Sequence, residues 1–213
     1  MKQSGYEIIN DLFVRYPALE VCREDITKAA ELICRAYGNG KKLLLCGNGG
    51  SASDSLHIVG ELMKEFAVKR PLPEKVKYAL KCAGDNGYMA ENLQGGLPAI
   101  SLVGVTSLES AYANDAAPDL AFAQQVLALG KEGDVLLGIT TSGNSANVIY
   151  ATRAARAIGV TPIILTGGTG GKIKSECECA VVVPAKETYK VQEYHLPVYH
   201  TLCLAVENEF FGK

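Results

Sequence analysis

The sequence has no large excess of charge of one sign and no long hydrophobic run. The formal net charge is −2 at pH 7, so the chain has no broad attraction to nucleic acid or to an acidic membrane surface. No stretch approaches the roughly 18 consecutive apolar residues of a membrane-spanning helix. Residues 1–6 lead into a charged amphipathic segment and lack the apolar core of a signal peptide. We therefore expect a soluble, cytoplasmic protein without a nucleic-acid or membrane partner.

The cysteines of the sequence are not spaced in pairs. The seven cysteines are an odd number, and they follow the spacing of neither a zinc finger nor a disulfide framework. Cys177 and Cys179 lie one residue apart before an apolar segment, and we interpret them, like the others, as small buried apolar residues. The full set is Cys22, Cys34, Cys46, Cys82, Cys177, Cys179 and Cys203.

The length and composition predict one domain with one core. The chain has 213 residues, of which 48% are apolar, and its charged residues are of both signs. Residues 1–38 predict a helical N-terminal extension, because apolar residues recur with helical spacing on both sides of a break at Pro17. The apolar faces of these helices either cap the sheet or, as we expect, form a helical bundle with other subunits.

Residues 39–213 alternate between apolar strand-like runs and helix-like segments. This alternation predicts an α/β fold, a three-layer sandwich in which helices cover both faces of a parallel sheet. Residues 70–96 fit neither pattern, and we interpret them as an insertion that serves as a lid, an interface element or a flexible loop. Pro197 should kink the last helix or disturb its first turns. Strands are expected near 41–46, 98–105, 133–140, 161–166 and 179–183, and helices near 53–66, 117–129, 145–158, 170–176 and 187–211.

Two loops rich in glycine, serine and threonine each follow a predicted strand and precede a predicted helix. They are residues 46–51 (CGNGGS) and 140–145 (TTSGNS). Glycines bring backbone N–H groups close to a ligand, hydroxyls add donors, and a helix N-terminus favours an anion. Both loops fall at the carboxyl ends of strands, where open parallel sheets bind ligands. The sequence therefore predicts a phosphate-binding site.

All three histidines occur in two predicted helices. His57 and Glu61 are four positions apart, so they share a helix face, and this pair suits either a surface contact or a metal site. The C-terminal helix carries His195 and His200, five positions apart, so only one of them should point toward His57. Spacing does not choose between these two.

Together the motifs resemble the phosphoheptose isomerase family of the sugar isomerase (SIS) domain superfamily. The resemblance implies a five-stranded flavodoxin-like sheet, a homotetramer with active sites at subunit boundaries, and one Zn²⁺ per subunit. It implies isomerisation of sedoheptulose 7-phosphate to D-glycero-D-manno-heptose 7-phosphate in ADP-heptose biosynthesis, through an enediol or enediolate. The residues that match are 45–51, His57, Glu61, 114–115, 133–148, 165–167, 191–193 and His200.

The resemblance also assigns roles to individual residues. Glu61 and His200 would be the acid–base pair. The implied zinc ligands are His57, Glu61, Gln192 and His200. The implied substrate contacts are Asn48, Gly49, Ser51, Asp115, Thr140, Thr141, Ser142, Ser145 and Gln192, with the phosphate on the serines and threonines and the sugar on Asn48 and Asp115.

The chain departs from the family at two positions. The family usually has an arginine shortly after the zinc-ligand glutamate, where this chain reads Lys64-Glu65-Phe66, and an aspartate three positions before the glutamine ligand, where this chain has Tyr189. Both positions concern substrate contacts, so a different ketose phosphate is an alternative substrate.

Three other functions fit part of the sequence. The pattern Gly47-x-Gly49-x-x-Ala52 satisfies a dinucleotide fingerprint, although a second phosphate loop has no role in that fold. A non-catalytic SIS-domain scaffold that binds the bacterial replication initiator is a second alternative, against which the complete set of zinc-site side chains argues. A sugar-phosphate-sensing domain is the third.

Overall fold

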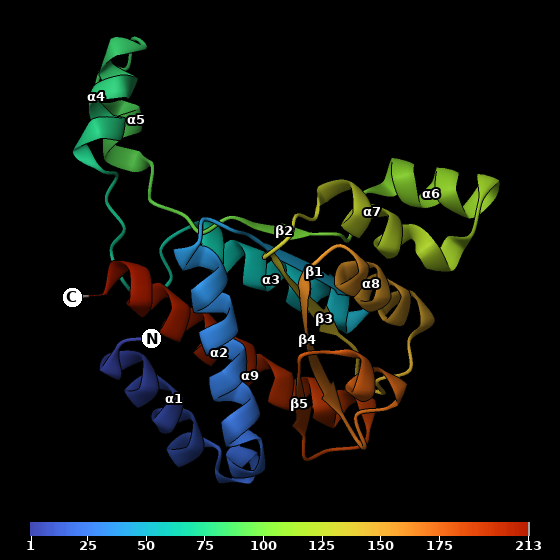
Figure 1. Ribbon diagram of the computed structural model, residues 1–213. Helices are drawn as coiled ribbons and strands as arrows, with labels where there is room; N and C mark the ends of the chain where they lie inside the picture. Colours follow the sequence, from blue (N-terminus) through green and yellow to red (C-terminus); the bar gives the residue numbers. More distant parts are fainter. Residues whose placement is uncertain (213) are drawn as a thin grey trace.

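The fold is built on a five-stranded parallel sheet. The computed structural model describes residues 1–212, and the strand order in its sheet is β2-β1-β3-β4-β5 (Figure 1). The prediction of a parallel α/β sheet is confirmed, although β2 is much shorter than expected. The strands are β1 (Leu43–Gly47), β2 (Ala99–Ser101), β3 (Val135–Ile139), β4 (Thr161–Gly167) and β5 (Cys179–Val183).

The strands separate two apolar layers. Side chains alternate between the faces of a strand, so Leu43 and Leu45 of β1 enter one core cluster while Leu44 and Cys46 enter the other. The cores of both layers are sealed from water, which explains why these strands read as continuous apolar runs.

Helices cover both faces of the sheet (Figure 1). The first cluster buries residues of α1, α2, α3 and α9, and the second buries residues of α7 and α8. The helices are α1 (Gln3–Arg15), α2 (Arg23–Gly38), α3 (Gly50–Met63), α4 (Glu74–Cys82), α5 (Tyr88–Asn92), α6 (Thr106–Asp115), α7 (Ala121–Leu129), α8 (Ala146–Ala157) and α9 (Thr188–Phe211). None of them, within residues 1–212, is both long and apolar enough to cross a membrane.

The apolar faces of α1 and α2 are covered within the chain. Leu12 of α1 and Ile26 and Ile33 of α2 lie in the same cluster as the sheet and α9. Within one chain these helices therefore cap the sheet, and a helical bundle formed with other subunits stays a prediction. The break at Pro17 is also confirmed, as a 3₁₀ turn over Pro17–Cys22.

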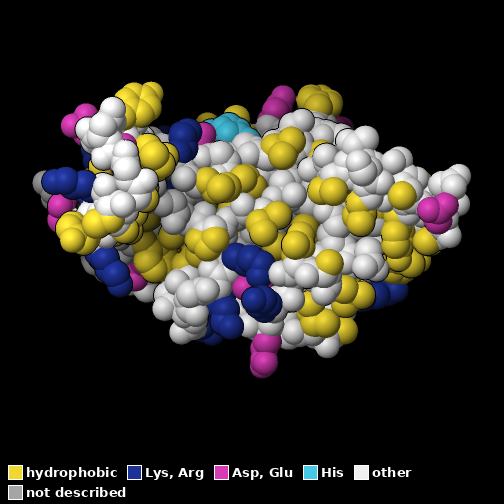
Figure 2. Space-filling model, turned by 90° about the horizontal axis from the view of Figure 1, so that it is seen from above, with side chains coloured by type: hydrophobic (Ala, Val, Ile, Leu, Met, Phe, Trp, Pro, Cys, Tyr) yellow, Lys and Arg dark blue, Asp and Glu magenta, His cyan; other side chains and the backbone are white. Residues whose placement is uncertain are grey.

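The predicted insertion forms an arm of two helices, α4 and α5. Neither helix buries a residue, and the arm projects from the body of the protein (Figure 1). On the face drawn in Figure 2, hydrophobic side chains gather toward this end, where Tyr78, Tyr88 and Met89 are exposed. Val76, Ala79 and Leu80 of α4 recur at helical spacing, but no residue of the arm enters a core.

Several element boundaries differ from the predictions. Helix α3 begins three residues earlier than expected, and residues 172–176 form a 3₁₀ turn in place of a helix. Helix α6 was not predicted, because it buries no residue and so has no apolar stripe. Helix α9 continues through Pro197 as one assigned helix of 24 residues.

His195 is fully buried in α9. Neither ring nitrogen has a hydrogen-bond partner in residues 1–212. Burial disfavours the charged imidazolium and lowers the pKa of His195 to about 4.

The first prediction concerns acid stability. Between pH 7 and pH 5 the unfolded chain protonates His195 while the folded chain does not, so folding loses about 2 kcal/mol from this group as the pH falls. Urea unfolding at the two pH values should show that His195→Leu loses less stability on acidification than the wild type by that amount. Equal losses in the two proteins would contradict the assignment of a buried neutral His195.

Candidate active site

The two predicted phosphate loops and the start of α9 enclose one pocket. Its volume is about 250 Å³, and it opens at the carboxyl ends of β1 and β3. None of the residues that line it carries a positive charge, so an anion there would be held by N–H groups and hydroxyls. The lining residues are Asn48, Gly49, Gly50, Ser51, Ile139, Thr140, Thr141, Ser145, Thr188 and Gln192.

Three helices begin at this pocket. Helix α3 begins at Gly50, α8 at Ala146 directly after Ser145, and α9 at Thr188. Unpaired N–H groups and the positive end of the helix dipole both favour an anion at such an end. Three converging N-termini therefore replace the lysine or arginine that the pocket lacks.

Two glycines are required by the shape of the first loop. Gly49 has a φ of +55°, a conformation that side-chain-bearing residues rarely adopt. At Gly50, a Cβ would collide with the side-chain amide of Gln192. A side chain at position 50 would therefore displace the amide of Gln192 from its present place.

The structure brings together most of the predicted phosphate and sugar contacts. Inside the pocket, the hydroxyls of Thr140 and Ser145 are 2.9 Å apart. Ser142 does not line the pocket, and its Oγ accepts a hydrogen bond from the backbone N–H of Asn144. Thr188 was missed, although its position at the first turn of a predicted helix was a usable signal. The predicted residues that line the pocket are Asn48, Gly49, Ser51, Thr140, Thr141, Ser145 and Gln192.

A second pocket of about 340 Å³ adjoins the first at Asn48 and Gly49. The side chains of Asn48 and Asn147 exchange two amide hydrogen bonds, of 2.9 and 2.8 Å, between the β1 loop and α8. Asn147, which also lines this pocket, was missed as a site residue. Asp115 lies exposed at the end of α6, where its carboxylate accepts a hydrogen bond from Asn114, and it lines neither pocket.

His57 and Glu61 form the predicted pair on α3. His57 Nε2 is 3.1 Å from Glu61 Oε1, and the imidazole is partly exposed. The Nζ atom of Lys64 is 3.1 Å from the other oxygen of Glu61. The lysine therefore holds this carboxylate in place.

The structure chooses His200 as the histidine that faces His57. The two ring centroids are 5.0 Å apart. The Nε2 atom of His200 is buried and has no hydrogen-bond partner in residues 1–212. Burial, and secondarily the neighbouring His57, lowers the pKa of His200, which favours a neutral imidazole.

Gln192 does not join these three side chains. It precedes His200 by eight residues on α9, which is about 12 Å along a helix, and it lies against Gly50 in the phosphate pocket. Across the part of the chain that the structure describes, no three His, Cys, Asp or Glu side chains are arranged to hold a metal ion. Imidazole, carboxylate and amide groups suit zinc chemically, but one chain does not assemble the four implied ligands.

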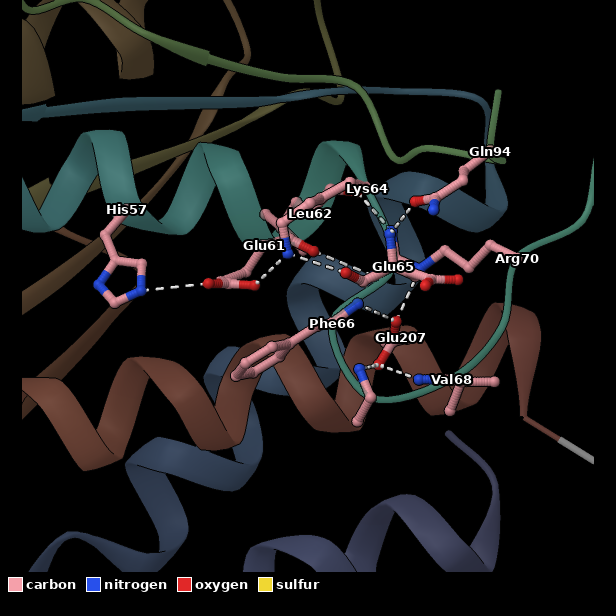
Figure 3. Close-up of polar contacts among 11 residues, drawn as sticks. His57, Glu61, Leu62, Lys64, Glu65, Phe66, Val68, Arg70, Gln94 and Glu207 are labelled. Carbon is pink, nitrogen blue, oxygen red and sulfur yellow. Dashed lines mark hydrogen bonds and ion pairs between the residues drawn. The ribbon is translucent and has the colours of Figure 1, made fainter. Parts of the chain in front are cut away.

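A buried ion pair joins the end of α3 to α9. Arg70 Nε donates to Glu207 Oε1 at 2.7 Å, and both side chains are fully buried (Figure 3). The guanidinium of Arg70 also donates to the carbonyl oxygens of Leu62 and Glu61 at 2.6 and 3.0 Å. These contacts satisfy carbonyls that the end of α3 leaves unpaired, and they fix the turn that carries Glu61.

Comparisons with known proteins identify the family. The SIS domain family matches residues 17–80 and 78–167. A phosphoheptose isomerase of Clostridium acetobutylicum is 40% identical over 190 residues, which cover 89% of this chain and 85% of that protein. This chain belongs to the phosphoheptose isomerase family. It is therefore an enzyme of the SIS-domain class of aldose–ketose isomerases.

Solved structures of the phosphoheptose isomerase family share the fold. The structure from Neisseria gonorrhoeae has a TM-score of 0.74 and 34% identity, and the match covers 91% of each chain. The structure from Francisella tularensis has a TM-score of 0.75 and 29% identity, with 96% of this chain and 95% of that chain covered. The family resemblance seen in the motifs thus extends over almost the whole fold.

The second prediction tests the buried ion pair. Glu207→Gln leaves the Arg70 charge buried without a partner, so the free energy of unfolding should fall by about 3–5 kcal/mol. The matched control is Glu74→Gln, which removes a carboxylate from an exposed pair with Lys77 and should cost less than about 1 kcal/mol. Urea unfolding of both variants measures the difference, and equal losses would contradict a structural role for Glu207.

Proposed function

We propose that the protein interconverts a ketose phosphate and an aldose phosphate, with sedoheptulose 7-phosphate as the ketose. One observation carries this proposal: α3 holds the phosphate pocket at its first turn and the His57–Glu61 pair further along. Gly50 and His57 are seven positions apart, which is about 10 Å along the helix and comparable to the length of an extended open-chain sugar phosphate. The relatives' name, phosphoheptose isomerase, supports a seven-carbon substrate.

The phosphate pocket anchors the end of the sugar that does not react. Ser51 and the 140–145 loop hold the phosphate, while Asn48, fixed by Asn147, offers an amide to the sugar hydroxyls. Binding of the phosphate thereby orients the carbonyl end of the sugar near Glu61.

Glu61 and His200 supply the proton transfers. In the ketose-to-aldose direction, a proton leaves C1 of the open-chain sugar to give an enediol, and a proton is then delivered to C2. Glu61 is a carboxylate that accepts a proton from carbon, and His200, whose pKa is lowered by burial, exchanges protons with the oxygens as a neutral imidazole. Lys64 Nζ lies 3.1 Å from the second oxygen of Glu61 and so is a charge partner for that carboxylate.

We further propose that His57, Glu61, His200 and Gln192 hold a zinc ion, which when bound supplies a Lewis acid for the developing enediolate charge. Within one chain, Gln192 lies in the phosphate pocket and away from the other three proposed ligands. The set of four ligands therefore needs a contribution from a second copy of the chain. This supports a homotetramer whose active sites are shared between subunits. The Nε2 atom of His57 and the Oε1 atom of Glu61 are 3.1 Å apart, which is close enough for both to bind one ion.

The third prediction is turnover. Zinc-loaded protein incubated with sedoheptulose 7-phosphate should yield an aldoheptose 7-phosphate by NMR, and Glu61→Gln should lower the rate by at least about 100-fold because the base is lost. Glu65→Gln, which breaks only a pair with Lys69, is the control and should stay active. Absence of product from a protein that binds zinc and the sugar phosphate would favour another ketose phosphate or a non-catalytic scaffold.

The fourth prediction tests the shared site. Glu61→Gln and Gln192→Ala should each be inactive alone, and refolding them together should restore activity that neither parent has. Restoration follows because mixed oligomers contain sites that join an intact Glu61 to an intact Gln192 from different chains. A mixture as inactive as its parents, although light scattering shows mixed oligomers, would show that each site belongs to one chain.

A further inference from the structure

A third glycine-rich loop lies against the 140–145 loop of the proposed phosphate pocket. It begins at the last residue of β4 and has the sequence GGTGGKI (residues 167–173, the β4 loop). A Cβ at Gly143 would collide with the backbone carbonyl of Gly170. The two loops therefore touch backbone to backbone, and side chains at these positions would keep them apart.

The β4 loop engages carbonyl groups of the 140–145 loop. The carbonyl oxygen of Thr141 accepts a hydrogen bond from the N–H of Gly167 at 3.2 Å, and that of Gly143 accepts one from the N–H of Ile173 at 3.1 Å. Ile173 is fully buried in the second core cluster, so this end of the β4 loop is anchored in the body of the protein. A carbonyl oxygen that faced an anion would repel it, whereas these two face N–H donors.

The N–H groups of the 140–145 loop are left available. Those of Thr141, Ser142 and Gly143 find no acceptor within residues 1–212. Successive unpaired backbone N–H groups are a common feature of anion sites. Thr141 also lines the proposed phosphate pocket. The contacts with the β4 loop thus occupy carbonyls that would repel a phosphate and leave N–H groups that would bind one.

Asn144 ties the two loops together. Its Oδ1 accepts a hydrogen bond from the N–H of Lys172 at 3.1 Å, and its Nδ2 donates to the carbonyl oxygen of Ser142 at 2.9 Å. Its own N–H donates to the Ser142 hydroxyl at 3.2 Å. The donor from one loop and the acceptor from the other fix which way the side-chain amide is turned.

We propose that Asn144 is a positioning residue, which together with the β4 loop holds the 140–145 loop in the conformation that binds phosphate. This inference rests on the proposed function, which assigns the 140–145 loop to the phosphate of the sugar. Asn144 is not among the residues that line the pocket, so it acts through the loop and not on the ligand. A loop that is held in place beforehand loses less conformational entropy when the ligand binds, and this raises the affinity.

The test compares Asn144→Ala with Asn92→Ala. Both variants remove an exposed side-chain amide that donates to a nearby carbonyl, and Asn92, whose partner is Tyr88 at 2.8 Å, lies in the arm. Within residues 1–212 only glycines have a positive φ, so alanine fits the backbone at both positions. Titration of the full-length protein with inorganic phosphate, followed by phosphorus-31 NMR, measures the affinity without turnover.

We expect the phosphate affinity to fall about 10-fold in Asn144→Ala, because hydrogen bonds that hold the loop are lost, and to stay unchanged in Asn92→Ala. The KM for sedoheptulose 7-phosphate should rise by the same factor while kcat changes less than about twofold, since the loop holds the end of the sugar that does not react. A phosphate affinity of Asn144→Ala equal to that of the wild type would overturn the proposal.

A second pair of variants tests the β4 loop itself. Gly171 and Gly168 have φ values of +58° and +62°, so alanine strains the backbone at either position. A Cβ at Gly171 would collide with the carbonyl oxygen of Ser142, whereas one at Gly168 would meet open space. Gly171→Ala should therefore lower the phosphate affinity at least as much as Asn144→Ala does, and Gly168→Ala should leave it unchanged. Equal affinities in the two glycine variants would reject the role of the β4 loop.

The inference and the proposed function fail separately. Hydrogen exchange, measured by mass spectrometry on peptides from residues 165–175, reports the N–H groups that donate to the 140–145 loop, and it needs no ligand. If the wild type binds no phosphate but exchange is faster in Asn144→Ala, Asn144 does hold the loops together and the proposed function fails. If the wild type turns over the sugar phosphate while affinity and exchange ignore Asn144→Ala, the proposed function stands and the role of Asn144 is rejected.

Discussion

The buried ion pair between Arg70 and Glu207 is the interaction on which the arrangement of the site depends. It joins segments 137 positions apart in sequence, the turn after α3 and the last turns of α9. The Glu207 carboxylate also accepts hydrogen bonds from the backbone N–H groups of Phe66, Ala67 and Val68 (Figure 3). Charges removed from water in this way need hydrogen-bond partners, and here each nitrogen of the Arg70 guanidinium and both oxygens of Glu207 have at least one.

The same contact links the site to the arm. The backbone carbonyl of Arg70 accepts a hydrogen bond from the backbone N–H of Gly95. The chain segments that lead into and out of the α4–α5 arm are therefore joined where the arm leaves the body of the protein. Arg70 thus contacts the base of the arm through its backbone carbonyl and the carboxyl end of α3 through its guanidinium, and Glu61 lies in the last turn of that helix.

Helices α3 and α9 act together as the frame of the site. They pack side by side, with Gly50 against Gln192 at one end and His57 against His200 further along. Regular helix geometry sets the spacing between the proposed phosphate pocket and the proposed acid–base pair. Hydroxyls and helix N-termini line the pocket without a cationic side chain, so the proposed binding of a phosphate would require no mobile cationic side chain to be ordered.

Local pattern was enough to predict the parallel sheet, the two glycine-rich loops between strand and helix, and the His57–Glu61 pair, because strand periodicity, glycine-rich turns and i,i+4 spacing are properties of short segments. It could not choose between His195 and His200, since the choice depends on which face of α9 meets α3. The arm helices and α6 were missed because none of them buries an apolar face. Only the tertiary structure decided which distant residues pair, as Arg70 with Glu207 and Asn48 with Asn147, because packing rather than sequence spacing brings side chains of different elements within hydrogen-bond reach.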